Sequence, residues 1–85
     1  MSDGLYSIGE VSKKLNIEQY TLRYWEKEFR DFVKPRRTSN KQNRVYTEED
    51  IRVLRTIDNL LHVDLYTIAG ARRQLYLRAA STAAE

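Results

Sequence analysis

Hydrophobic residues recur at helical spacing near the start of the chain, directly after a helix start signal. Ser7 and Glu10 form an S-x-x-E capping box, in which each side chain accepts a hydrogen bond from the other residue's backbone amide. The apolar positions that follow lie on one helix face: Ile8, Val11 and Leu15. Asn16 tolerates the left-handed backbone that ends many helices. The pattern predicts a short helix that begins after Ser7 and ends at Asn16.

A second helix is predicted from about Glu18 to Phe29, and it has two different faces. Its apolar residues recur at i, i+3 and i+7: Leu22, Trp25 and Phe29. A second set at helical spacing is aromatic and basic: Tyr20, Arg23, Tyr24 and Lys27. We therefore expect Trp25 to point inward, while Arg23 and Tyr24 point outward. Two short helices joined by a tight turn form a helix-turn-helix.

The stretch after the second helix has the features of a β-hairpin. Pro35 disfavours helical geometry at Lys34, so the chain must leave the helix there. β-Branched or aromatic residues stand near the two ends of the stretch: Thr38, Val45 and Tyr46. The residues 39–41, Ser-Asn-Lys, can reverse the chain between them. We expect a two-stranded wing, with a disordered loop as the alternative because the tip has no glycine.

Two further helices are predicted in the second half of the chain. Thr47 and Asp50 form a weaker cap signal, and the apolar stripe that follows is Ile51, Leu54, Ile57 and Leu61. The last helix is expected to start after Thr67, with an inward set of Ile68, Ala71 and Leu75. Arg72 and Arg73 would then point outward.

The overall prediction is a mainly α fold, a winged helix-turn-helix of about four helices with a small β-hairpin wing. One domain is expected over residues 1–77, followed by a frayed tail over residues 78–85. Gly70 lies in the first turn of the last helix, where it costs about 1 kcal/mol relative to Ala. The sequence pattern offers no reason for that glycine.

Length and composition argue against an enzyme. A chain of 85 residues is too short for a core together with a substrate cleft of ordinary volume. The chain has no cysteine and one histidine, His62, which with Asp58 is expected to form a surface pair. No nucleophile and base are paired, and the acids after Thr47 suit the positive end of a helix dipole better than a metal site. We expect no cofactor, no metal, and a soluble, cytoplasmic, nucleoid-associated protein.

The positive charge of the chain is local. The net charge is +3, but the segment from Lys34 to Arg44 carries five basic residues and no acid. Such a segment is either a solvated loop or a loop that binds phosphates. The second helix also has two interpretations. Its outer face could contact nucleic acid, which we favour. Alternatively, Tyr20 and Tyr24 could be half-buried core aromatics while Arg23 and Lys27 pair with Glu26 and Glu28.

Four segments, taken together and in order, resemble the DNA-binding domain of the MerR (mercury-resistance-regulator) family of bacterial transcription regulators. They are YSIGEVSKKLNI, TLRYWEKEF, KPRRTSNKQNRVYTEEDIRVL and YTIAGARRQL, and the resemblance covers Leu5 to about Leu77. It implies a winged helix-turn-helix, in which the first two helices read DNA and the hairpin is the wing. The last two helices would support a second, smaller wing.

The family's L-R-Y-[YW] motif falls on residues 22–25, which implies that Arg23 and Tyr24 contact DNA. Its wing pattern falls on Arg36, Arg37, Arg44 and Tyr46, which implies phosphate contacts there. With the helix face derived above, the expected DNA-binding residues are Gln19, Tyr20, Arg23, Tyr24, Lys27, Arg36, Arg37, Lys41, Arg44 and Tyr46.

The chain departs from the family pattern at several positions. Glu18 stands where most members have Ser or Thr, so the second helix lacks its usual cap and has an anion near the phosphates. The wing tip, usually rich in glycine, is SNKQN, and Leu65 stands where glycine commonly ends the third helix. The family's long dimerising helix and effector domain have no counterpart here. We expect either the N-terminal piece of a longer regulator or a small member that gains dimerisation or signal input elsewhere.

Three functions are compatible with these observations. The first is sequence-specific binding of double-stranded DNA by a transcriptional regulator, with RNA polymerase as a further candidate partner. The second is a small architectural, excisionase-like DNA-binding protein, and the third is a protein-interaction module with a basic loop. We expect a homodimer in the intact regulator, a monomer for this chain, and no membrane partner.

Overall fold

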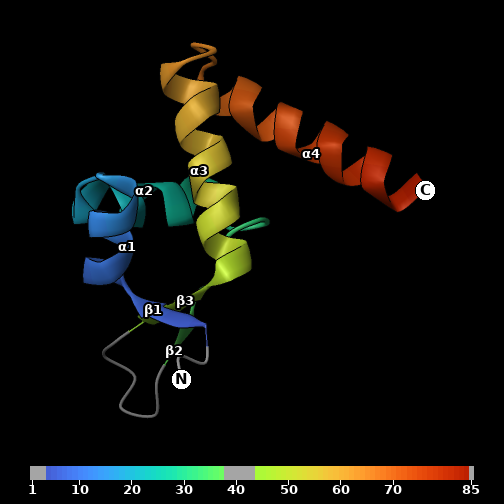
Figure 1. The fold of residues 1–85 in the computed structure, drawn as a ribbon. Coiled ribbons are helices and arrows are strands. Elements are labelled where there is room, and N and C mark those ends of the chain that lie inside the picture. The colour runs from blue at the N-terminus through green and yellow to red at the C-terminus, as the bar shows by residue number, and fades with distance from the viewer. Residues whose placement is uncertain (1–3, 38–43, 85) are drawn as a thin grey trace. The chain divides into compact units, whose positions relative to one another are not determined.

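The computed structural model describes residues 4–37 and 44–84, and within these ranges it is mainly helical with one small sheet (Figure 1). The elements follow in the order β1 (Leu5–Ser7), α1 (Ile8–Leu15), α2 (Gln19–Glu28), β2 (Arg36–Arg37), β3 (Arg44–Thr47), α3 (Glu48–His62) and α4 (Ile68–Ala84). They form two compact units, one up to Arg55 and one from Thr56. The prediction of a mainly α fold with four helices and a small wing is confirmed.

The sheet is antiparallel, and β3 lies between its two partners in the order β1-β3-β2. Tyr6 of β1 pairs with Tyr46 of β3, and Arg36 of β2 pairs with Val45 of β3. The hairpin predicted from the sequence is therefore present, while its turn lies outside the described residues. The sequence did not predict β1, because three residues are too few to show an alternating pattern.

The start and end of α1 agree with the sequence in atomic detail. The Ser7 hydroxyl accepts a hydrogen bond from the Glu10 amide at 3.2 Å, and the Glu10 carboxylate accepts one from the Ser7 amide at 2.8 Å. Asn16 ends the helix in the left-handed region, with φ of 56°. The Ser12 hydroxyl donates to the Ile17 carbonyl across the turn at 2.5 Å. These bonds set the short connection to α2.

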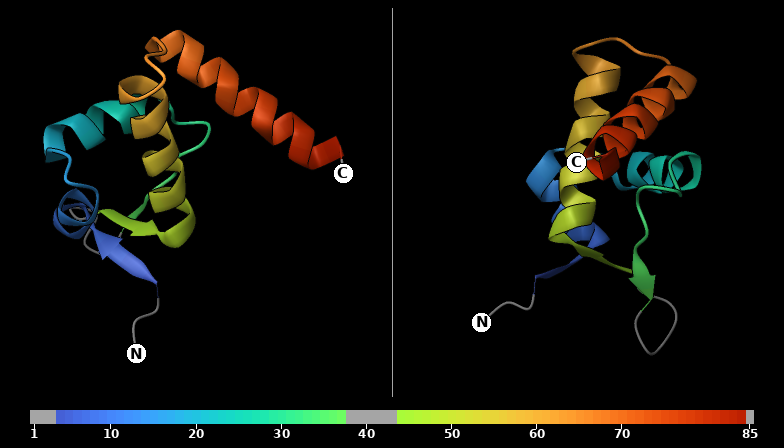
Figure 2. Two further views of the ribbon diagram at one scale, coloured as in Figure 1. Left: turned by 45° about the horizontal axis from the view of Figure 1, so that its top comes forward. Right: turned by 90° about the vertical axis from the view of Figure 1, so that its right-hand side faces the viewer.

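The core of the first unit is built from α1, α2, the segment after α2, β3 and the start of α3. Its buried hydrophobic residues are Val11, Leu22, Trp25, Phe29, Val33, Tyr46, Ile51 and Leu54. Each large side chain buried in this way contributes about 1.5–3 kcal/mol relative to an exposed one. α1 contacts α2 as well as β1 and β3, so it joins α2 to the sheet (Figure 2).

The cap predicted for α3 is present, but its buried stripe differs from the prediction by one residue. The Asp50 amide donates to the Thr47 hydroxyl at 3.1 Å. Leu60 is buried, whereas Leu61, which we expected inward, is partly exposed. The first part of α3 belongs to one unit and the rest to the other. The buried residues of α3 are therefore spaced by three, at positions 51, 54, 57 and 60, and the buried face turns slowly around the helix axis along its length.

The second unit contains the end of α3, the connection and α4, and its buried residues are Ile57, Leu60, Ala71 and Leu75. Its connection explains Gly70. A Cβ atom at Gly70 would lie 3.2 Å from Cδ1 of Tyr66 and 3.3 Å from the hydroxyl of Thr67. The Gly70 amide also donates to that hydroxyl at 3.0 Å. Glycine thus lets the Tyr66 ring and the Thr67 cap approach the first turn of α4 closely.

α4 continues to Ala84 and so includes most of the segment 78–85, for which we expected a frayed tail. The segment contains no proline or glycine, and alanine has the highest intrinsic helix propensity. The local sequence is therefore compatible with helical backbone in this segment.

Leu65 is the clearest strained position in the connection, and we expect Leu65→Gly to stabilise the fold. Its φ is 61°, which costs a side-chain-bearing residue about 1–2 kcal/mol, and its side chain is 78 % exposed. Part of the gain is lost because glycine makes the unfolded chain more flexible. We expect the free energy of unfolding in urea to rise by about 0.5–1 kcal/mol. Leu65→Ala retains the Cβ atom and should show no such gain, and a less stable glycine variant would contradict the assignment of strain.

Candidate nucleic-acid interface

α2 presents an exposed face of aromatic and basic side chains, which we call the reading face: Tyr20, Arg23, Tyr24 and Lys27. Tyr20 is 69 % exposed and Tyr24 is 50 % exposed, while Trp25 on the opposite side is only 3 % exposed. The predicted division of α2 into an inward and an outward face is confirmed. The helix thus buries its apolar side and leaves these polar groups in solvent.

The alternative in which Arg23 and Lys27 are used in surface ion pairs does not hold in the structure. Neither side chain forms an ion pair within the described residues. Glu26, one of the expected partners, is buried and accepts a hydrogen bond from another residue. The cationic groups of the reading face are therefore available to a partner molecule.

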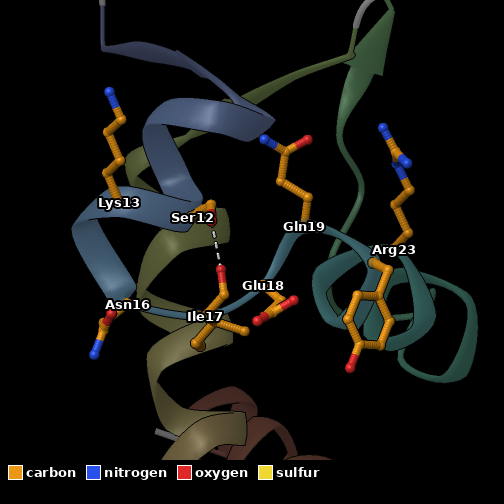
Figure 3. Close-up of a pocket in the computed structure, with 8 residues that line it drawn as sticks. Ser12, Lys13, Asn16, Ile17, Glu18, Gln19 and Arg23 are labelled. Carbon is orange, nitrogen blue, oxygen red and sulfur yellow. Dashed lines mark hydrogen bonds between the residues drawn. The ribbon is translucent and has the colours of Figure 1, made fainter.

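An open hollow lies beside the reading face, where α1 turns into α2 (Figure 3). Its lining comes from the end of α1, the turn and the start of α2: Ser12, Lys13, Asn16, Ile17, Glu18, Gln19, Tyr20 and Arg23. In Figure 3 the side chains of Lys13, Gln19 and Arg23 point toward the top of the view. An ammonium, an amide and a guanidinium group thus belong to the lining of one hollow.

The N-terminus of α2 opens onto this hollow without a side-chain cap. Glu18 occupies the N-cap position in an extended conformation, with φ of −65° and ψ of 145°, and makes no capping hydrogen bond. Its carbonyl accepts from the amides of Thr21 and Leu22, each at 3.1 Å. The expected loss of the usual cap is confirmed. The positive end of the helix dipole thus favours an anion here, while the Glu18 carboxylate opposes one.

The wing places a second set of basic residues in the same unit. Arg36 lies on β2 with an exposed side chain, and Arg37 pairs with Arg44 in the strand register. The side chains of Arg37 and Arg44, and the whole of Lys41, lie outside what the structure describes. The backbone register alone therefore places Arg37 and Arg44 at the outer end of the described hairpin.

Tyr46 does not belong to the exposed site, so the expectation that its side chain contacts DNA is wrong. The residue is 0 % exposed, and its hydroxyl donates a hydrogen bond to the carboxylate of Glu26. Strand alternation places Tyr46 on the same sheet face as Arg44, so the sequence pattern gave no reason to separate the two residues. The burial of Tyr46 comes from its contact with α2, which has no local sequence signal.

Asp50 is a second buried carboxylate at the base of the wing. Its oxygens accept from the backbone amides of Lys34 at 3.2 Å and Thr47 at 3.0 Å. Those two amides lie just before β2 and at the end of β3. The sequence indicated the contact with Thr47 through the cap pattern. The contact with Lys34, sixteen positions away, had no sequence signal.

Tyr6 is engaged in contacts that hold β1 in place. Its hydroxyl donates to Glu48, and the Lys14 ammonium lies 5.3 Å from the centre of its ring. The hydrogen bond to Glu48, then burial and the negative charges of Glu48 and Glu10, raise the pKa of Tyr6 above its ordinary value. Tyr6 therefore remains a protonated donor at neutral pH, and it joins β1 to α1 and to the start of α3.

Other candidate sites receive little support from the geometry. The His62 ring lies 2.6 Å from the Asp58 carboxylate, which confirms the predicted surface pair. Among the described residues, no group of three or more His, Cys, Asp or Glu side chains could hold a metal ion. In that same part of the chain, no helix combines the length and the hydropathy needed to cross a bilayer.

Comparison with known protein families decides the class of the protein. Residues 6–77 match the model of the MerR HTH family regulatory proteins. The chain belongs to this family. The match includes α1, α2, the wing and α3, and it agrees with the resemblance found in the sequence motifs. This is a family of regulatory proteins and not of enzymes, as expected from the chain length.

A curated relative supports the same assignment. The MerR-family domain is similar to the uncharacterized HTH-type transcriptional regulator YyaN of Bacillus subtilis (strain 168), with 39 % identity over 56 residues. The aligned segment covers 66 % of this chain and 39 % of that protein. The similarity therefore concerns less than half the length of the relative.

The uncapped start of α2 leads to a prediction about Glu18. Glu18→Ser should stabilise the domain by about 0.5–1 kcal/mol, because a serine hydroxyl can accept from the free amides of the first turn. It should also tighten binding to duplex DNA at low salt, because an anion beside the phosphates is removed. Thermal unfolding and duplex titration measure the two effects. Glu18→Gln removes only the charge, so it separates the effect on DNA affinity from the effect of the new cap on stability. Unchanged affinity in both variants would contradict the prediction that the Glu18 charge weakens DNA binding.

Proposed function

We propose that this MerR-family domain binds double-stranded DNA in a sequence-specific manner and acts in transcriptional regulation. In this proposal α2 enters the major groove and the wing contacts phosphates. The observation that carries it is the two-sided packing of α2. The helix buries Trp25 and Leu22 and leaves Arg23, Tyr24 and their neighbours exposed, without ion pairs in the described residues. A helix that reads a groove needs this combination of a fixed inner side and a polar outer side.

The reading face has chemistry suited to both parts of a duplex. A guanidinium group such as that of Arg23 can donate two hydrogen bonds to guanine, and an amide such as that of Gln19 can pair with adenine. Tyrosine hydroxyls and a lysine ammonium can donate to phosphate oxygens. Gln19 and Tyr20 lie in the first turn of α2, where recognition helices commonly meet base edges. We therefore assign base contacts mainly to the start of α2.

The wing is assigned to the DNA backbone. The segment from Lys34 to Arg44 has no acidic residue, and Arg36 has an exposed side chain on β2. Basic side chains on a short strand can neutralise phosphates and release counterions without reading sequence. The role of the wing would then be to supply affinity and set the register of α2 on the duplex.

The assembly of an intact regulator is also part of the proposal. A homodimer would bind two half-sites, and linkage would raise its overall affinity. α4 is the longest described helix and has 17 residues, which is short of three heptads. We therefore propose that this chain alone is a monomer with modest affinity for one half-site.

Removing one wing arginine should weaken binding to every duplex to a similar degree. For Arg36→Ala, Arg37→Ala or Arg44→Ala, we expect the plot of the logarithm of the binding constant against the logarithm of the salt concentration to become less steep. The magnitude of its slope should decrease by about one unit, because one phosphate contact is lost. Sequence preference should survive. Titrations of a random duplex at several salt concentrations measure the slope. A variant with a changed sequence preference and an unchanged slope would refute the phosphate assignment.

The two faces of α2 should respond differently to mutation. Trp25→Ala should cost about 3–5 kcal/mol of stability, because it empties a buried aromatic site. Arg23→Ala and Tyr24→Phe should leave the thermal midpoint nearly unchanged and weaken DNA binding, Arg23→Ala more strongly, because charge-assisted contacts are stronger.

Parallel melting and duplex binding of these three variants distinguish the reading face from the core. Arg55→Ala on α3 removes an exposed arginine outside the proposed site and provides the matched control, which should leave DNA binding unchanged. An Arg23→Ala variant that melts early and binds normally would show that the assigned faces of α2 are exchanged.

A further inference from the structure

Two buried carboxylates hold the base of the wing, one from the helix before it and one from the helix after it. Asp50 of α3 accepts the amides of Lys34 and Thr47, which closes the hairpin at its base. Glu26 of α2 accepts the hydroxyl of Tyr46 from β3. Both carboxylates are only 6 % exposed, and all these residues belong to the first unit.

These two contacts have different consequences for the wing. Asp50 connects the two ends of the hairpin with the start of α3. The Tyr46 hydroxyl instead reaches from the central strand to α2, across 20 positions in the sequence. Glu26 lies between Trp25 and Lys27, on the helix that carries the reading face. The Tyr46–Glu26 hydrogen bond is therefore a direct link between the wing and the reading helix.

We propose that Tyr46 and Glu26 are positioning residues that couple the wing's phosphate contacts to the base contacts of α2. The inference rests on the proposed function. A duplex presents its groove and its backbone at a fixed separation, so both contacts form together only if the protein holds the same separation beforehand. A hydrogen bond in a buried, low-dielectric setting is directional and strong enough to hold it. Neither residue contacts DNA itself.

A double-mutant cycle tests the coupling. Arg36→Ala is combined with Tyr46→Phe, which removes the hydroxyl and retains the ring. We expect Arg36→Ala to weaken duplex binding about tenfold in the unmodified chain and less than about twofold in Tyr46→Phe, because a wing that is not held no longer delivers Arg36 to its phosphate.

The sheet itself supplies a matched control. Tyr6→Phe also removes a tyrosine hydroxyl that donates to a glutamate, but its partner Glu48 lies on α3 rather than α2. We expect Arg36→Ala to cost about tenfold in this background, as in the unmodified chain. Glu26→Gln retains an acceptor for Tyr46 and should preserve the full effect of Arg36→Ala. A residue that acts only through general stability would not separate these backgrounds.

Tyr46→Phe leaves the buried Glu26 carboxylate with one hydrogen bond fewer and could prevent folding. In that case the cycle is measured in the double variant Glu26→Leu with Tyr46→Phe, which removes both polar partners together. Its melting curve establishes that it is folded before binding is measured. The same reduced effect of Arg36→Ala is expected there.

The outcomes distinguish this inference from the proposed function. If the unmodified chain binds no duplex at any salt concentration, the proposed function fails and the inference fails with it. If the chain binds DNA and Arg36→Ala costs the same factor in all backgrounds, the coupling is wrong and the function stands. A reduced cost in Tyr46→Phe and full cost in Tyr6→Phe support the coupling.

Discussion

The enclosed side chain of Tyr46 links the strand of the wing to the reading helix through its hydrogen bond with Glu26. A tyrosine buried without a partner for its hydroxyl would be costly, and so would a buried carboxylate. Each residue thus makes the other's burial possible. The pair stabilises one arrangement of β3 and α2. This arrangement also fixes where the exposed Arg36 of the wing lies relative to the exposed Arg23 and Tyr24 of α2.

The remaining polar contacts of the first unit act in a similar way. Asp50 joins the two ends of the wing to the start of α3, and Tyr6 joins β1 to α1 and α3. The sheet has short strands and therefore few backbone hydrogen bonds of its own. Side chains at its base supply much of the geometric definition that a longer ladder would provide. Positive charge can then be concentrated at the outer end of the wing without loosening its base.

Two departures from the family pattern occur at positions where the backbone favours a particular residue type, a cap at a helix start and a glycine at a left-handed position. Glu18 leaves the first amides of α2 without a side-chain cap, and Leu65 adopts a left-handed conformation that favours glycine. Gly70, in contrast, allows the close approach of Tyr66 and Thr67. A small domain has little stability to spare, so such local costs must be offset by its core. The packing around Trp25, Phe29 and Leu54 provides that compensation.

Local signals in the sequence determined most of the elements, because capping and helical periodicity act over a few residues. Ser7 and Glu10 predicted the start of α1, Asn16 its end, and the spacing of Trp25 and Arg23 the two faces of α2. The sequence did not reveal that β1 joins the sheet, that Tyr46 lies inside, or that Leu60 rather than Leu61 is buried. Those outcomes depend on contacts between residues far apart in the chain, such as Tyr46 with Glu26 and Lys34 with Asp50. Only the tertiary structure brings these partners together, because their burial and hydrogen bonding arise when the elements pack.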